Sequence, residues 1–162
     1  MPLTLRPFTL QDIPLHLQWC QDIHAGQYMS RSAPRLFNEQ GILASPLFVW
    51  FIILVNELET GTLWLEKETQ TDETATLGIL LGNETQFGKG IGQQAIRPGI
   101  QHAVRHFSFH TVRLNVRQSN LRAIACYQKC GFQIIKEGSK IISPQESIPY
   151  YEMQYRLTSH SG

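Results

Sequence analysis

The sequence predicts a mixed α/β or α+β fold in which helices pack on a sheet. Apolar stretches of strand length alternate along the chain with stretches whose spacing fits helices, and no repeat or linker divides them. The chain has 162 residues, of which 42% are hydrophobic and 17% are charged. These values are typical of a single globular domain over residues 1–162, and they exclude disordered, collagen-like and coiled-coil proteins.

The N-terminal part predicts a strand, a helix and an irregular segment. Residues 3–5 alternate between apolar and polar side chains, which indicates a short strand. Thr9 or Asp12 can cap a helix that runs to about Cys20. Residues 21–46 contain glycines and prolines at several positions, so we expect a broken helix and a loop there.

Three strands are expected next. The continuous apolar stretch at 48–56 is typical of a central strand that is covered on both faces. Thr60 and Gly61 indicate a tight turn into a second strand at 62–67, which makes a hairpin. After a polar turn, residues 74–82 form the third strand.

A glycine-dense loop at 83–92 follows, and then a helix to about Phe107. Pro98 lies inside this helix and should kink it, because proline lacks the amide hydrogen and clashes with the preceding turn. Residues 111–117 alternate strictly between apolar and polar side chains, which predicts a strand.

One more helix and two strands complete the expected order. Ser119 or Asn120 can cap the helix, and Gly131 suits the position just beyond its C-terminus. Residues 132–136 and 150–157 then form the last strands.

Charge is distributed unevenly along the chain. No acidic residue occurs between Glu84 and Glu137, whereas that stretch contains eight lysines and arginines. Because the whole chain carries +1, the stretch is +8 and the remainder −7. This asymmetry indicates one region built for an anionic ligand and another that tolerates a cationic one, although a chance run of solvated basic side chains is the alternative.

Gly88, Gly90 and Gly92 lie at every second position between a strand and a helix. Glycines in this arrangement let backbone amides converge, and the N-terminus of the helix adds partial positive charge, so an anion site is predicted. A merely flexible turn is the alternative. The spacing does not fit a Walker loop. Gly90-x-Gly92-x-x-Ala95 matches the dinucleotide fingerprint, but the acidic residue expected about 20 positions later is absent.

Two segments together resemble the GNAT acetyltransferase superfamily. Residues 88–92, Gly-Lys-Gly-Ile-Gly, are similar to its pyrophosphate loop, and residues 120–132 are similar to its N-x-x-A-x-x-x-Y-x-K-x-G-F signature. The similarity covers about residues 74–136. It implies a mixed, mostly antiparallel central sheet of about six or seven strands flanked by about four helices. The branches that it suggests are the ribosomal-protein N-terminal and the aminoglycoside acetyltransferases.

The resemblance implies transfer of an acetyl group from acetyl-CoA, a co-substrate, to a primary amine of a small molecule or peptide, by direct attack in a ternary complex. The amides of 88–92 would bind the diphosphate, and Asn120 and the backbone at Leu81 and Gly82 would bind pantetheine. The cofactor-binding residues that it implies are Leu81, Gly82, Phe87, Gly88, Lys89, Gly90, Ile91, Gly92, Asn120, Ala123, Tyr127 and Lys129.

Tyr127 would lie near the sulfur atom, where we expect it to be the catalytic general acid. A free tyrosine has a pKa of about 10, so it is protonated at neutral pH. Helix packing is its alternative role. No general base stands out, since Asp72, Glu73 and Glu84 are each expected to be solvated turn residues.

Three histidines recur at four-residue spacing, at 102, 106 and 110, but no carboxylate accompanies them. We therefore expect a helix surface there and no metal site. Trp19, Tyr28 and Trp50 either line an acceptor pocket or, by default, fill the core.

The acidic remainder of the chain favours a cationic acceptor such as an aminoglycoside, a polyamine or a peptide N-terminus. Three cysteines, the lack of a visible secretory signal and the lack of a bilayer-length apolar run indicate a cytoplasmic protein without a membrane partner. A homodimer is left open. The rival functions are a nucleic-acid-binding module that uses the basic 85–136 segment, which lacks a binding motif, and a catalytically silent CoA-binding regulator.

Overall fold

The structure is a computed structural model that describes residues 2–23 and 31–157. Seven strands form one sheet in the order β1-β2-β3-β4-β5-β7-β6, and only β4 and β5 run parallel. The strands are β1 (Leu3–Pro7), β2 (Phe48–Val55), β3 (Leu58–Glu66), β4 (Thr74–Leu81), β5 (Thr111–Arg117), β6 (Gln133–Ser143) and β7 (Glu146–Arg156). The predicted mixed, mostly antiparallel sheet is therefore confirmed.

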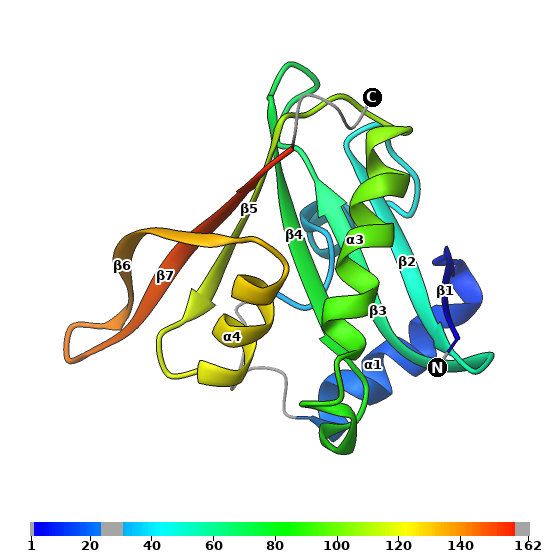
Figure 1. Ribbon diagram of the computed structural model, residues 1–162, viewed down its shortest axis with the longest axis horizontal. Coiled ribbons are helices and arrows are strands. Elements are labelled where there is room, and N and C mark those ends of the chain that lie inside the picture. The colour runs from blue at the N-terminus through cyan, green and yellow to red at the C-terminus, as the bar shows by residue number, and fades with distance from the viewer. Residues whose placement is uncertain (1, 24–30, 158–162) are drawn as a thin grey trace.

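Helices cover both faces of this sheet (Figure 1). They are α1 (Ile13–Asp22), α2 (Arg35–Gln40), α3 (Ile91–Val104) and α4 (Leu121–Lys129), with short 3-10 turns η1 (Leu10–Asp12) and η3 (Glu84–Gln86). Two apolar clusters lie on the two faces. One packs under α3 and α4 and includes Leu63, Ile96 and Met153, and the other packs under α1 and includes Trp19 and Trp64.

The parallel pair β4 and β5 separates soon after it starts. The two strands pair only at Thr74–Thr111, Ala75–Val112 and Thr76–Arg113. Beyond these pairs they diverge, and α4 lies beside the opening (Figure 1). Backbone groups at the diverging ends therefore have no partner strand between β4 and β5, which leaves room for a ligand.

The first hairpin turns at a different place from the predicted one. Residues 60–61 lie inside β3, and the two-residue turn is Asn56-Glu57, with φ angles of 51° and 68°. Val55 pairs with Leu58, as in a type I′ hairpin. Gly61 instead permits close strand approach, because a Cβ there would lie 2.2 Å from the carbonyl oxygen of Leu80.

The last two strands are longer than predicted, since the hairpin extends to a turn at 144–145. Most side chains of β6 are exposed, so this part of the chain lacks the apolar alternation that reveals a half-buried strand.

The predicted caps of α4 are confirmed: Asn120 accepts a hydrogen bond from the Ala123 amide at 3.3 Å, and Gly131 has a φ of 100°. Helix α3 ends at Val104, before the predicted Phe107, and is one continuous helix through Pro98. Among residues 2–23 and 31–157, no helix is both long and apolar enough to cross a bilayer.

Candidate functional site

A cleft of about 680 Å³ opens where β4 and β5 separate. It is lined by the diverging strands, the glycine-rich loop before α3, one edge of α4 and the part of the β6–β7 hairpin nearer its turn. Segments distant in the sequence therefore meet around one cavity.

The glycine-rich loop forms one wall of this cleft through Gly88, Gly90 and Gly92. Gly88 and Gly90 adopt left-handed φ angles of 76° and 80°, which glycine tolerates best. Gly90 is the N-cap of α3 and supplies no capping side chain. The first amides of α3 therefore lack intrahelical partners, and they make this wall a favourable place for an anion.

Helix α4 lines the cleft next to this loop. Ala123 and Tyr127 are four residues apart, so both lie on the edge of α4 that lines the cleft. The carbonyl oxygen of the Asn120 side chain caps the helix, which leaves its amide group as a donor at the cleft. Lys129 also lines the cleft and adds positive charge.

Tyr127, the predicted general acid, is a titratable side chain of α4 that lines the cleft. Burial, together with the neighbouring Cys126, raises the pKa of the Tyr127 hydroxyl above its ordinary value of 10.0. The ring lies 5.9 Å from that of Phe132, measured between centroids. The hydroxyl is therefore protonated throughout the neutral range, as a hydrogen-bond or proton donor must be.

Phe87 connects the glycine loop to α4. The guanidinium carbon of Arg122 lies 3.7 Å from the centroid of the Phe87 ring, and both side chains line the cleft. Such a cation–π contact holds the loop against the helix, and it places a positive charge near the glycine amides.

Comparisons with known proteins agree with this geometry. The family model of the acetyltransferase (GNAT) domain matches residues 2–133. The chain belongs to the GNAT acetyltransferase family. The predicted acetyl-CoA-dependent N-acetyltransferase is thereby confirmed at the level of the family.

Several relatives are named for aminoglycoside chemistry. The chain is 28% identical over 151 residues to aminoglycoside N(6′)-acetyltransferase type 1 of Klebsiella pneumoniae, covering 81% of this chain and 74% of that protein. It is 36% identical over 78 residues to a kanamycin resistance protein of Rhizobium radiobacter, covering 47% of this chain and 68% of that protein.

Solved structures show the same fold. An aminoglycoside acetyltransferase bound to coenzyme A and kanamycin matches with a TM-score of 0.71, 23% identity and coverage of 96% of this chain and 95% of that one. Spermidine N-acetyltransferase from Vibrio cholerae, bound to CoA and spermine, matches with a TM-score of 0.75, 17% identity and 95% coverage of both chains.

In this acetyltransferase the cleft brings together most of the residues implied by the resemblance. Those that line it are Leu81, Phe87, Gly88, Gly90, Ile91, Gly92, Asn120, Ala123, Tyr127 and Lys129. Gly82 and Lys89 are not among the described lining residues. The Gly82 amide donates to the Thr60 carbonyl at 2.8 Å, and a Cβ on Gly82 would lie 2.4 Å from the Trp19 ring. Gly82 therefore makes room for an indole and does not offer its amide to pantetheine.

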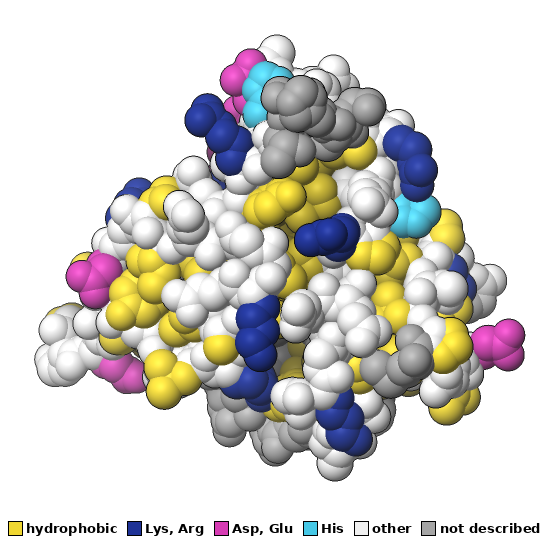
Figure 2. All heavy atoms as spheres, in the orientation of Figure 1, with side chains coloured by type: hydrophobic (Ala, Val, Ile, Leu, Met, Phe, Trp, Pro, Cys, Tyr) yellow, Lys and Arg dark blue, Asp and Glu magenta, His cyan; other side chains and the backbone are white. Residues whose placement is uncertain are grey.

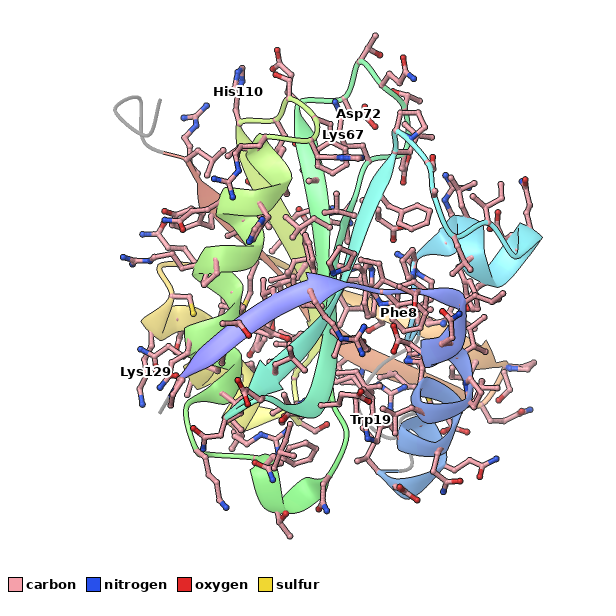
Figure 3. The ribbon with its side chains drawn as sticks, turned by 90° about the vertical axis from the view of Figure 1, so that its right-hand side faces the viewer. Phe8, Trp19, Lys67, Asp72, His110 and Lys129 are labelled. Carbon is pink, nitrogen blue, oxygen red and sulfur yellow. The ribbon has the colours of Figure 1, made fainter. Side chains whose placement is uncertain are left out.

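The other side chains singled out in the sequence lie elsewhere in the acetyltransferase. Asp72, Lys67 and His110 lie at one end of the molecule, away from Lys129 and Trp19 (Figure 3). Asp72 accepts a hydrogen bond from the Thr69 amide, and Glu73 is exposed beside His110, 3.6 Å away. Neither acidic residue lines the cleft, so neither is placed to be a base there.

Two of the aromatic candidates lie in the core, and two of the histidines contact separate parts of the chain. Trp19 and Trp50 are buried in the core, whereas Tyr28 lies outside the described residues. His102 contacts the Phe51 ring and His106 contacts the Ser45 carbonyl, so these histidines have different partners.

The sequence analysis did not predict the wall of the cleft that lies away from the glycine-rich loop and α4. It includes Asn115 and Arg117 of β5 and Trp64, Gly78 and Lys140. The alternation of 111–117 contained a signal for the first two, because it places Asn115 and Arg117 on the face opposite the apolar residues. The others come from separate strands, and no local pattern indicates that they meet.

The basic stretch contributes directly to this site. Arg117, Arg122 and Lys129 line the cleft, whereas Arg113 and Lys136 each lie 3.6 Å from Glu152. Figure 2 shows lysine and arginine side chains over the middle of one face and at its upper margins, whereas the acidic side chains in this view lie toward the margins. This distribution favours an anionic ligand at the centre of that face.

Proposed function

We propose that this enzyme transfers the acetyl group of acetyl-CoA to a primary amine of a small molecule or peptide, by direct attack in a ternary complex. The observation that carries the proposal is the continuity of one cleft from the glycine amides to the separated ends of β4 and β5. Relatives are named for acetylation of aminoglycosides and of spermidine. We carry over the N-acetylation and not the acceptor.

Acetyl-CoA supplies a thioester, whose acyl carbon accepts a nucleophile. The amides at the start of α3 and the side chains of Arg122 and Lys129 bind its phosphates. The amide group of Asn120 donates to pantetheine, and the open strand edge near Leu81 provides backbone partners.

Tyr127 donates a hydrogen bond to the sulfur as it leaves. In the net reaction a C–N bond forms, a C–S bond breaks and one proton moves from the amine nitrogen to sulfur. The raised pKa of Tyr127 makes its hydroxyl a weak acid, so it stabilises the developing thiolate chiefly as a donor while the amine supplies the net proton. In this proposal the attacking amine is neutral when it binds or loses its proton to water, which agrees with the absence of a carboxylate among the described lining residues.

The Tyr127→Phe variant tests this role. We expect turnover to fall about 100-fold while the affinity for acetyl-CoA stays within about twofold, since the ring still packs against Phe132. Thiol release measures the first quantity and calorimetry the second. Unchanged turnover would remove Tyr127 from the mechanism.

A glycine pair tests the binding of acetyl-CoA. Gly88 and Gly41 have similar φ angles, 76° and 69°, and a Cβ at either position has no heavy atom within 4 Å. Alanine should therefore strain both backbones equally, by about 1–2 kcal/mol. Only Gly88→Ala should weaken acetyl-CoA binding, by at least about tenfold. Equal affinities of the two variants would place the diphosphate away from this loop.

A further inference from the structure

We propose that the acceptor amine carries an anionic group, a carboxylate or a phosphate, which binds cationic side chains on the wall of the cleft formed by β5, β6 and Arg31. This inference rests on the proposed function and names the substrate class for it. It departs from the expectation of a cationic acceptor that the charge count of the chain favoured.

The first cation on this wall comes from β5. Val112, Leu114 and Val116 are buried in the cluster under α3 and α4. Because side chains alternate along a strand, Asn115 and Arg117 point to the opposite face of the sheet, and both line the cleft. This wall thus includes a neutral amide and a guanidinium, and Arg117 also interacts with the rest of the chain.

Two more cations come from distant segments. Lys140, on the outer strand β6, is exposed, lines the cleft and has no ion-pair partner among the described residues. Arg31 precedes α2 and also lines the cleft. Its Nη2 pairs with Glu66, whereas its Nη1 is buried and has no hydrogen-bond partner in the described part of the chain. Arg31 therefore retains a donor after its own ion pair is formed.

No aspartate or glutamate occurs among the described residues that line the cleft. Residues 24–30, which follow Ile23, contain none in their sequence, and the side chain of Glu84 lies outside the described part of the structure. Two buried acidic side chains of the sheet, Glu66 and Glu152, are each paired with basic groups. Glu66 pairs with Arg31 and accepts from the Arg35 amide at 2.8 Å, and Glu152 lies 3.6 Å from both Arg113 and Lys136.

This arrangement discriminates by charge. A polycation would lose hydration on entering the cleft and meet like charges, with no carboxylate among the described lining residues to compensate, which is unfavourable. A carboxylate or phosphate would form charge-assisted hydrogen bonds with the same side chains. The cations also disfavour the ammonium form of the acceptor, because like charge lowers the pKa of a nearby amine. They therefore favour the neutral, nucleophilic form of the amine in a cleft whose described lining residues include no carboxylate.

These cations are separate from those at the diphosphate. Arg122 and Lys129 belong to α4, on the wall nearest the glycine loop. Arg31 contacts Glu66 of β3, and Lys140 lies on the outermost strand of the sheet. The cleft is therefore positive on two walls, one for the co-substrate and one for the acceptor.

Matched pairs of acceptors test the inference through kcat/KM for thiol release. One pair is 4-aminobutanoate and its amide, the other is phosphoethanolamine and ethanolamine, and spermidine and kanamycin serve as polycations. We expect the anionic member of at least one pair to exceed its neutral partner and both polycations by at least about tenfold. The pair with the larger ratio identifies carboxylate or phosphate. A preference for the neutral members or for the polycations would overturn the inference and leave the proposed function standing.

Binding of the same amines to the CoA-loaded protein distinguishes a failure of the inferred ligand class from a failure of the proposed function. If no amine supports turnover but the anionic amines still bind more tightly than their neutral partners, the proposed function is contradicted and the ligand class holds. If no amine supports turnover and the anionic amines bind no better, both are overturned.

Charge reversal in the cleft provides the second test. Lys140→Glu should lower the ratio of anionic to neutral acceptor by about tenfold and raise turnover of spermidine, which a loss of folding would not do. Arg105→Glu is the matched control, because Arg105 is exposed just beyond α3 and does not line the cleft. The same change of ratio in both variants, or in neither, would contradict the assignment of Lys140.

Discussion

A single methyl group at Gly78 should disrupt the packing between β3 and β4. Gly78 pairs directly with Trp64, and the indole lies across the place where a side chain would stand. A Cβ on Gly78 would lie 2.0 Å from Cζ2 and 2.1 Å from Cε2 of Trp64. Carbon atoms normally approach to about 3.5–4.0 Å, so the ring would have to move by about 1.5 Å.

The surroundings of Trp64 allow little movement, because only 3% of the residue is exposed. Overpacking of such a site costs about 1–3 kcal/mol, and displacement of a buried ring adds to this. We expect Gly78→Ala to lower the free energy of unfolding by about 3 kcal/mol. For a domain of this length, that corresponds to a decrease in Tm of roughly 6–12 °C.

A double-mutant cycle measured by urea unfolding assigns the loss to the ring. Trp64→Leu alone should destabilise the protein by about 3–5 kcal/mol, because it removes a large buried side chain. On that background Gly78→Ala should cost less than about 1 kcal/mol, since the overlapping atoms are gone. An equal cost of Gly78→Ala on both backgrounds would refute steric overlap with Trp64 as the cause.

Three further perturbations concern stability. Burial lowers the pKa of His16 from 6.5 to about 4, so between these pH values the unfolded chain binds more protons than the folded protein. The free energy of unfolding should therefore decrease as the pH drops from 6.5 towards 4, by up to about 1.4 kcal/mol per pH unit. His16→Leu should flatten that part of the pH profile of urea unfolding, and an unchanged slope would contradict the assignment. Asn120→Ala should cost about 1 kcal/mol in the same assay through loss of the cap of α4, whereas Ser119→Ala should cost less than about 0.5 kcal/mol, and equal costs would argue against the cap. Gly131→Ala should cost about 1–2 kcal/mol, because φ is 100° and its Cβ would lie 3.1 Å from the Tyr155 ring, and a neutral effect would argue against this strain.

Local patterns predicted the elements whose signals are themselves local. The cap at Asn120 and the left-handed Gly131 were found because each depends on a few neighbouring residues. The strand at 111–117 was found because one of its faces is buried and the other is not. The outer part of the β6–β7 hairpin was not predicted. Most side chains of β6 are exposed, on both faces of the strand, so its sequence has no alternation of apolar and polar residues.

The position of the turn between β2 and β3 could not be predicted from turn-forming residues alone. Thr60 and Gly61 read as a turn, yet the chain turns at Asn56-Glu57, where a glutamate adopts a φ of 68°. Pairing of the two buried strands over Phe48–Val55 and Leu58–Glu66 sets the turn position, and Gly61 is required by the closeness of β4. Tertiary contacts thus override the usual preference of turn residues.

The sequence by itself determined the acetyltransferase family, and it predicted the loop and the helix that line one side of the cleft, since the glycine loop and the α4 motif are continuous segments. The opposite wall was decided by tertiary structure, which brings Arg31, Arg117 and Lys140 to one cavity. A charge count cannot reveal which charges are neutralised by a neighbour. Folding pairs Glu66 and Glu152 with basic side chains and brings cationic side chains to the described lining of the cleft, because electrostatic energy depends on distance in space and not on separation along the chain.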